Sequence, residues 1–387
     1  MTFYELLADL LVIFTAAKLL GYLAQRFGQP AVLGELVGGV LVGVSVLGLV
    51  DPRVEVLHLL AEIGVLILLF EIGLESDLDD LIKVGWQSTL VGCVGIAVPF
   101  ALGYVVMSRL GYEGVRAVFI GATLTATSIG ITARVLSDLG KMDTAAAKII
   151  IGAAVIDDIL GLVILSVVQG LAQTGEVSLL GIVKTTALAL GFLVVAILVG
   201  QVAAPRLLKL VRQMDVRGGL LLFAVGLAML FAYLAHAVGS ATIVGAFAAG
   251  LVLAKTDDRH PIEERVRPLA DFFVPIFFVT IGAAVDVTVF DPIDPANRPV
   301  LGMAALLILC AVAGKLVSGL VVKPTEPRQR LAIGVGMIPR GEVGLVFAGV
   351  GLAAGVVSAE VYAAVVAVVI VTTFLAPPLL KLVFSRR

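Results

Sequence analysis

Two adjacent acids, Asp157 and Asp158, interrupt an apolar run from 149 to 165 that is otherwise able to cross a bilayer. One aspartate at the bilayer centre costs about 2.5 to 3.5 kcal/mol even on a lenient insertion scale, so two in succession persist only where something binds or neutralises them. A carboxylate can bind a metal cation when it is ionised and a proton when it is neutral. The pair therefore indicates a site for reversible cation or proton binding.

The two acids need not do the same work. Neighbouring residues on a helix point about 100° apart, so both side chains cannot face one small target equally. One can pair with a cation from another helix while the other faces an aqueous cavity. Lys315 is the one lysine well inside a later apolar span, and it is the natural partner for an aspartate.

The elements that must position these groups are membrane helices. The chain has 387 residues, of which 60% are hydrophobic and only 14% are charged, and its mean hydropathy is +1.12. A soluble domain is nearer a quarter charged. Long apolar runs between short polar loops favour an all-α polytopic membrane protein over an outer-membrane barrel. The first residues are typical of a retained helix and not of a signal peptide, no soluble domain is expected after the last span, and the net charge of −2 argues against a nucleic-acid partner.

Apolar windows of about 20 residues predict thirteen spans. They lie near 3–25, 30–49, 55–75, 87–108, 115–137, 146–172, 179–202, 218–237, 240–255, 268–285, 299–322, 330–354 and 360–381. Sorting the 27 Lys and Arg residues by alternate loops gives 19 on one side, five on the other and three inside spans. The positive-inside rule then predicts an N-terminus outside and a C-terminus in the cytoplasm.

Three pairs of segments match in sequential order at a nearly constant shift. The shifts are 211, 209 and 214 residues, and the matched segments are 34–43 with 245–254, 68–77 with 277–286, and 116–130 with 330–344. Each match is seven predicted helices apart, and because seven is odd the two copies run in opposite directions through the membrane. An inverted repeat of this kind is typical of secondary transporters, whose site lies where discontinuous helices meet near the midplane.

The fifth and twelfth predicted helices have the features of discontinuous helices. Residues 122–130 combine β-branched and hydroxyl side chains with a glycine at mid-depth. In the twelfth, Pro339 breaks the hydrogen-bond ladder beside Arg340 and Glu342. Unwound backbone inside a membrane is tolerated only where it is buried in protein or lines a cavity, so these breaks predict a site between the two helices.

Several motifs together resemble the monovalent cation:proton antiporter-2 family, over essentially the whole chain. They are the Asp157-Asp158 pair, Lys315, the stretches 126–134 and 339–344, and Gln29-Pro30 before Leu33-Gly34-Glu35. The resemblance implies a fold of thirteen helices in an inverted-topology repeat, with the two discontinuous helices crossing. It also implies a transporter and not an enzyme.

The resemblance further implies a role for each site residue. Asp158 would be the principal ion-binding carboxylate, with Na+ held at Asp158 and Asp157, and Asp157 would form a salt bridge with Lys315 in the ion-free state. Thr127 and Ser128 would supply oxygen ligands or support, and Arg340 and Glu342 would stabilise the crossing.

The implied activity is exchange of Na+ or Li+ for H+ across the inner (plasma) membrane, serving pH homeostasis, with no cofactor beyond the transported ions. The double aspartate is the pattern associated with electrogenic exchange of two protons per sodium ion. Transport would occur by movement of a core domain, about 55–172 and 268–381, against a homodimeric scaffold in the lipid bilayer, about 1–50 and 179–255.

Some alternatives stay open at this point. When sodium draws Asp157 away from Lys315, the lysine loses its counter-charge and would release the second proton; otherwise both protons come from the aspartates and Lys315 is structural. Exchange of K+ for H+ is the nearest rival function, and sodium-coupled uptake of an organic anion is a weaker one. An intramembrane aspartyl protease needs its two aspartates on different helices, so it does not fit.

A second group of charges lies at the end of the third predicted helix. It contains five acids, Glu71, Glu75, Asp77, Asp79 and Asp80. They could draw cations toward the site, or they could be an ordinary solvated helix end.

Overall fold

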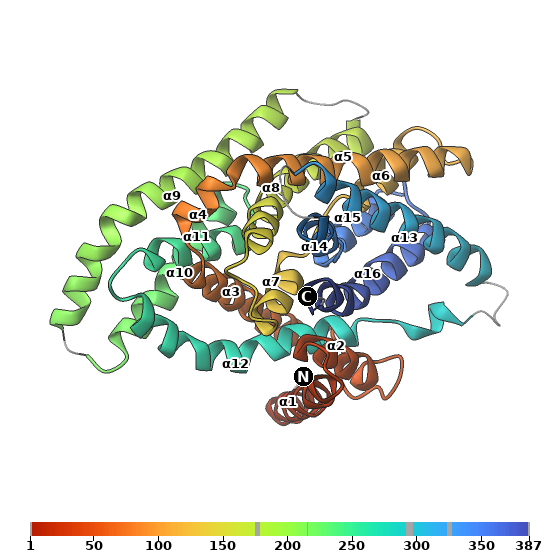
Figure 1. Ribbon diagram of the computed structural model, residues 1–387. Coiled ribbons are helices and arrows are strands. Elements are labelled where there is room, and N and C mark those ends of the chain that lie inside the picture. The colour runs from red at the N-terminus through yellow and green to blue at the C-terminus, as the bar shows by residue number, and fades with distance from the viewer. Residues whose placement is uncertain (1, 175–178, 215, 292–296, 323–326, 386–387) are drawn as a thin grey trace. The chain divides into compact units, whose positions relative to one another are not determined.

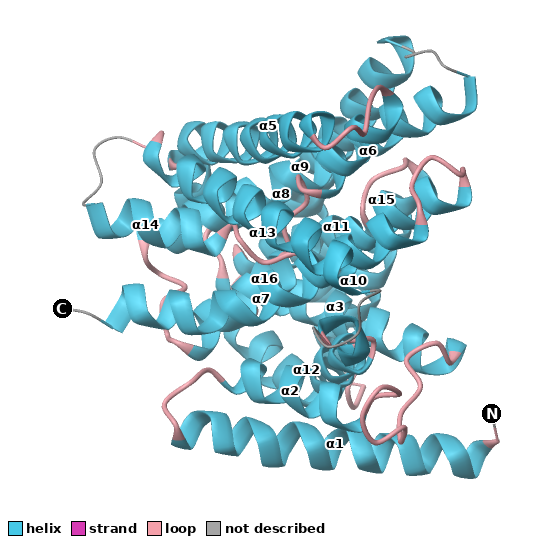
Figure 2. Cartoon of the chain, turned by 90° about the vertical axis from the view of Figure 1, so that its right-hand side faces the viewer, coloured by secondary structure: helices cyan, strands magenta, loops and turns pink. Residues whose placement is uncertain are grey.

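A computed structural model describes residues 2–174, 179–214, 216–291, 297–322 and 327–385. Over these residues the regular structure consists of α-helices and one short 3-10 helix, with no strand (Figures 1 and 2). The chain divides by its internal contacts into two compact units.

The first unit contains residues 1–82 and 185–285. Its helices are α1 (Phe3–Arg26), α2 (Ala31–Val42), α3 (Glu55–Glu75), most of α9 (Leu179–Gln213), α10 (Gly219–Ala237), α11 (Thr242–Ala254) and α12 (Arg259–Ala283). The short helix α4 (Leu78–Lys83) lies at the boundary, where the chain passes to the second unit.

The second unit contains residues 83–184 and 286–387. Its helices are α5 (Gly85–Arg109), α6 (Val115–Thr123), α7 (Ile129–Asp138), α8 (Ala145–Thr174), η1 (Val287–Phe290), α13 (Asn297–Leu320), α14 (Pro327–Gly336), α15 (Glu342–Ala353) and α16 (Ala359–Ser385). The unit thus joins a stretch of each half of the chain.

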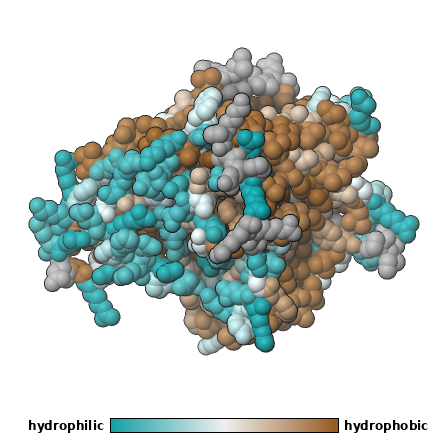
Figure 3. All heavy atoms as spheres, in the orientation of Figure 1, coloured by the Kyte–Doolittle hydropathy of each residue, from teal (hydrophilic) through white to brown (hydrophobic). Residues whose placement is uncertain are grey.

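Most of the long helices are apolar enough to cross a bilayer. In the described part of the chain eight helices have the length and hydropathy of a membrane span, and α2 and α11 are shorter apolar helices. Large apolar side chains are exposed along α1 and α9, among them Leu11, Val195 and Leu198, and hydrophobic residues cover much of the face in Figure 3. In lipid such exposure carries no penalty, so the chain is a multi-pass helical membrane protein.

Each of the thirteen predicted spans overlaps a helix or a pair of helices. One difference is in the span predicted over 30–49, where α2 ends at Val42. Gly43 is extended and pairs with Val50 through an isolated parallel bridge. A Cβ on Gly43 would lie 2.7 Å from the Cα of Ala283, so the close approach of α12 explains why the chain turns there on a glycine.

Glycines related by the predicted repeat lie at two close helix crossings in the first unit. A Cβ built on Gly39 of α2 would lie 2.8 Å from the Cα of Gly282 on α12, and one built on Gly73 of α3 would lie 2.9 Å from the Cα of Gly250 on α11. The shift of 211 relates Gly39 to Gly250, and the shift of 209 relates Gly73 to Gly282. The two crossings are therefore repeat equivalents, and at each the helix backbones meet with no side chain between them.

The predicted boundary between core and scaffold passes through this first unit. That prediction groups α3 and α12 with the core, whereas α3 packs against α11 and α12 packs against α2. The functional division stays a prediction.

Both helices predicted to be discontinuous are interrupted. Residues 124–128 separate α6 from α7, and residues 337–341 separate α14 from α15. Pro339 explains the second break, because it has no N–H and disfavours helix at the residue before it. The first break has no proline. There the hydroxyls of Thr123 and Thr125 donate to the carbonyls of Ile120 and Ala122 at 2.7 and 2.8 Å, and such local bonds compete with helix continuation.

Candidate functional site

The acidic pair lies in the interior of the second unit, on α8. Thr144 caps this helix, since its hydroxyl accepts the N–H of Ala147 at 3.2 Å. The next turns are alanine and isoleucine, which face other helices of the unit. Asp157 is 1% exposed and Asp158 is 7% exposed, so both carboxyl groups are removed from bulk solvent.

Lys315, on α13, lies beside Asp157. Its side chain is fully buried, and its Nζ lies 3.4 Å from Oδ1 of Asp157, whose side chain is also fully buried. The same Nζ donates a shorter hydrogen bond of 2.6 Å to the carbonyl oxygen of Thr125, just past the end of α6. The lysine therefore joins the acidic helix to the first helix break.

Arg340 joins the two breaks directly. It is 0% exposed, and its Nη1 donates to the carbonyl oxygen of Ala126 at 2.8 Å. A second hydrogen bond also connects the two breaks: the backbone N–H of Ser128 donates to the carbonyl oxygen of Pro339 at 2.8 Å. The carbonyl oxygens of Thr125 and Ala126, just after α6, thus accept hydrogen bonds from two basic side chains. Such contacts are favourable because the C-terminal end of a helix carries partial negative charge.

The end of α14 is satisfied by hydroxyls. Thr127 donates to the carbonyl oxygen of Met337 at 3.2 Å, and Thr132 donates to that of Gly336 at 2.7 Å. These are carbonyls at a helix C-terminus, where the helix itself supplies no donor. Each hydroxyl oxygen keeps lone pairs with which it can accept a proton donor or contact a cation.

Four formal charges meet around the breaks. Asp157 interacts electrostatically with both Lys315 and Arg340, and Lys315 also feels Asp158. Two carboxyl groups and two basic side chains are therefore buried close together. An uncompensated charge among them would be costly, because the interior does not solvate it.

The predicted site residues fall into three groups in the structure. Asp157, Lys315, Thr127 and Arg340 are joined to the two breaks or to one another by the contacts above. Asp158 and Ser128 are buried, and a Cβ on Gly341 would lie 2.9 Å from the hydroxyl oxygen of Ser128. The side chain of Glu342 lies outside the described residues.

Sequence reasoning gave no role to two hydroxyls of this site, Thr132 and Thr373. Thr132 lies within the 126–134 motif, so its neighbours were the available signal. Thr373, on α16, donates to the carbonyl oxygen of Arg340 at 2.6 Å. Its signal was the repeat, because it lies next to Thr372, the repeat counterpart of Asp158.

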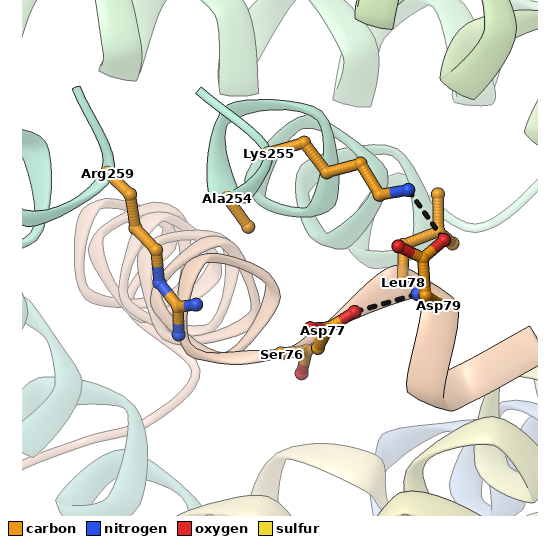
Figure 4. Close-up of a pocket in the computed structure, with 7 residues that line it drawn as sticks. All are labelled: Ser76, Asp77, Leu78, Asp79, Ala254, Lys255 and Arg259. Atoms are coloured by element: carbon orange, nitrogen blue, oxygen red, sulfur yellow. Dashed lines mark hydrogen bonds and ion pairs between the residues drawn. The ribbon is translucent and has the colours of Figure 1, made fainter. Parts of the chain in front are cut away.

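The acids at the end of α3 have cationic neighbours. A cavity of about 230 Å³ in the first unit is lined by Ser76, Asp77, Leu78, Asp79, Ala254, Lys255 and Arg259 (Figure 4). Lys255 pairs with Asp79 at 2.7 Å, Arg259 donates to the carbonyl oxygen of Glu75 at 2.8 Å, and Asp77 accepts the N–H of Asp79 at 2.8 Å. The basic side chains of Lys255 and Arg259 thus lie beside the acids at the end of α3. They offset negative charge that would otherwise attract metal ions.

A helical membrane fold with a buried cluster of acidic and basic side chains at two helix breaks defines the class of ion-coupled secondary transporters. Residues 11–386 match the model of the transmembrane sodium/hydrogen exchanger family. The chain belongs to that family, which consists of transporters and not enzymes.

Individual relatives match over the full length. The chain is 47% identical to the high-affinity Na+/H+ antiporter NhaS3 of Synechocystis, covering 98% of this chain and 90% of that one. It is 36% identical to the Na+/H+-K+ antiporter GerN of Bacillus cereus, covering 99% and 97%. The sodium proton antiporter MjNhaP1 of Methanocaldococcus jannaschii has the same fold, with a TM-score of 0.78 at 17% identity over 100% of this chain and 97% of that one.

Proposed function

We propose that this protein is a secondary active antiporter that exchanges Na+ or Li+ for H+ by alternating access. The observation that carries the proposal is the buried contact of Lys315 with both Asp157 and the first helix break. A carboxylate in this setting can be neutralised by a metal ion or by a proton but not by both at once. Competition between the two ions for one site produces exchange.

In the proposed mechanism Asp158 is the principal ligand of the cation, and Asp157 shares it after leaving Lys315. Thr127 and Ser128 contribute oxygen ligands or support beside the first break. Arg340 and Glu342 hold the two discontinuous helices where they cross. The short contacts between residues 126–128 and 339–341 support this assignment.

The adjacent acids and the buried lysine support an electrogenic stoichiometry of two protons per sodium ion. In the sodium-free state Asp158 carries one proton and Lys315 carries the other. Binding of one Na+ by the two ionised acids releases both protons, so two positive charges leave the buried centre as one enters.

The wider architecture of the proposal follows the sequence prediction. The chain crosses the inner membrane thirteen times, with the N-terminus outside and the C-terminus in the cytoplasm. It forms a homodimer through a scaffold of about 1–50 and 179–255, against which the core of about 55–172 and 268–381 moves. The repeat-related glycine crossings support an inverted topology, because each joins a helix of one copy to a helix of the other.

The test is transport by purified protein in proteoliposomes. Asp158→Asn keeps the shape of the side chain but removes the charge, and we expect it to abolish sodium-dependent dissipation of a pH gradient. Asp257→Asn, at an exposed position, is the control and should retain wild-type transport. Undiminished exchange in Asp158→Asn would overturn the assignment.

Exchange of K+ for H+ is a second candidate, because a 36% identical relative carries K+ in its name as well as Na+. Transport with Na+, Li+ and K+ in turn, under a clamped membrane potential, separates the two. Current that depends on Na+ or Li+ supports the proposal, whereas activity with K+ alone supports the alternative.

A further inference from the structure

Two adjacent threonines on α16 have different partners. Thr372 and Thr373 are both buried, at 0% and 1% exposure. Thr372 donates to carbonyls of its own helix, those of Val368 and Val369, at 2.7 and 3.1 Å. This is the usual state of a threonine in an apolar helix. Thr373 instead donates to the carbonyl oxygen of Arg340 at 2.6 Å, 33 residues away.

The carbonyl of Arg340 depends on that donor. Arg340 lies between α14 and α15, and the α15 helix takes Gly341 as its N-terminal cap, so regular helix bonds supply no N–H at this position. A buried carbonyl without a donor is costly. Thr373 therefore fixes the peptide that follows Arg340.

That peptide is connected to the ion site in two steps. The guanidinium of Arg340 donates to the carbonyl of Ala126, and the carbonyl of the preceding Pro339 accepts the N–H of Ser128. Any rotation of the segment 339–341 would change both contacts. The hydroxyl of Thr373 thus acts on residues 126–128 through Arg340.

The internal repeat gives an independent reason to look at this position. Helices α8 and α16 begin at residues 145 and 359, which are 214 apart. The same shift relates Asp158 to Thr372 and Ile159 to Thr373. A polar pair therefore occurs on each of the two equivalent helices, offset by one residue, because Asp157 corresponds to Val371 and Thr373 corresponds to Ile159. On α8 it is acidic and contacts Lys315, and on α16 it is a hydroxyl pair of which one member holds Arg340.

We propose that Thr373 is a positioning residue for cation exchange, which holds the 337–341 break so that Arg340 and Pro339 keep residues 126–128 in place beside the acidic pair. The inference rests on the proposed function. It assigns Thr373 no contact with the transported ion, so its loss weakens binding of the cation more than it slows the conformational change.

The experiment compares Thr373→Val with Thr372→Val in proteoliposomes. Both variants replace a hydroxyl with a methyl of similar size at adjacent buried positions, but only the first leaves the Arg340 carbonyl without its donor. For Thr373→Val we expect the apparent KM for Na+ to rise about tenfold, equal to about 1.4 kcal/mol, with a maximal rate within about twofold of wild type. Thr372→Val should keep the wild-type KM, and Thr373→Ser, which keeps the hydroxyl, should restore it.

The same measurements identify a purely structural role. A KM for Thr373→Val equal to that of Thr372→Val, or a raised KM in Thr373→Ser, overturns the inference. Should Thr373→Val fail to assemble, Thr373→Cys replaces it, because a thiol is a weak donor of similar volume; an unchanged KM there also contradicts the inference. A wild-type protein with no cation-dependent proton movement contradicts the proposed function itself, which is a different result.

Discussion

Two regions of this molecule use the same pair of residue types in opposite surroundings. In the second unit Lys315 and Asp157 are 3.4 Å apart with both side chains fully buried. At the end of α3 in the first unit, Lys255 and Asp79 are only 2.7 Å apart, but their side chains are 34% and 64% exposed. The longer contact is the more consequential one, because water screens the exposed pair and not the buried one.

The comparison teaches that burial, and not contact distance, decides what a charge can do here. The exposed pair can be replaced by solvated ions at little cost. The buried pair can change its partners only if another charge, such as a metal ion or a proton, enters or leaves at the same time. The proposed coupling between ions is therefore expected in the second region.

The largest expected effect is on the buried lysine. Lys315→Met leaves Asp157 without its counter-charge, and breaking a buried pair in this way typically costs about 3–5 kcal/mol. We expect a marked fall in the free energy of unfolding in detergent at neutral pH. The double variant Lys315→Met/Asp157→Asn should recover most of the loss, because it leaves no uncompensated charge.

The matched control for that variant is Lys255→Met, which removes the same side chain from the exposed pair. If both single variants lose equal stability, the contrast between the two regions is wrong. If the double variant is no better than Lys315→Met alone, the loss comes from the contact with Thr125 and not from the charge of Asp157.

The positions of the helices and of the two breaks could be predicted from the sequence, because apolar windows and Pro339 act locally. The repeat is a pattern in the chain itself, so it could also be proposed from the sequence, and the inverted orientation of its two copies stays a prediction. The repeat-related crossings of Gly39 with Gly282 and of Gly73 with Gly250 agree with it.

Partner choice was harder to predict. The sequence places Thr372 and Thr373 in one apolar helix, but the direction in which each hydroxyl donates depends on which backbone carbonyls lack a helical donor nearby. The break at Arg340 supplies such a carbonyl from a distant segment. The pairing of Asp79 with Lys255 likewise depends on how α11 meets the end of α3, which no local pattern encodes.

A smaller effect is expected from the packing of the first unit, where close contact between helix backbones should contribute more to stability than the exposed ion pair. Gly39→Ala would bring its Cβ against the backbone of α12, and overpacking of this kind costs about 1–3 kcal/mol. Gly226→Ala on α10, where nothing lies within 4 Å of the added Cβ, is the control. It should match wild type or gain up to about 1 kcal/mol.

The measurement is the thermal unfolding of both variants in the same detergent. A Gly39→Ala protein as stable as Gly226→Ala would show that the α2–α12 crossing can open without cost. In that case the exposed charges would contribute more to the stability of the first unit than the glycine crossings do.

The smallest expected effect is at the exposed pair itself. Lys255→Met should lower stability by no more than about 1 kcal/mol and leave the apparent KM for Na+ within about twofold of wild type, because surface ion pairs contribute little. The loss of stability relative to wild type should vanish in about 1 M choline chloride, where the screening length falls to about 3 Å. Lys209→Met, at an exposed position on α9, controls for the loss of a surface charge. A salt-independent loss, or a KM shift that Lys209→Met does not share, would mean that the cavity beside Asp79 takes part in ion exchange and that the acids at the end of α3 do draw cations inward.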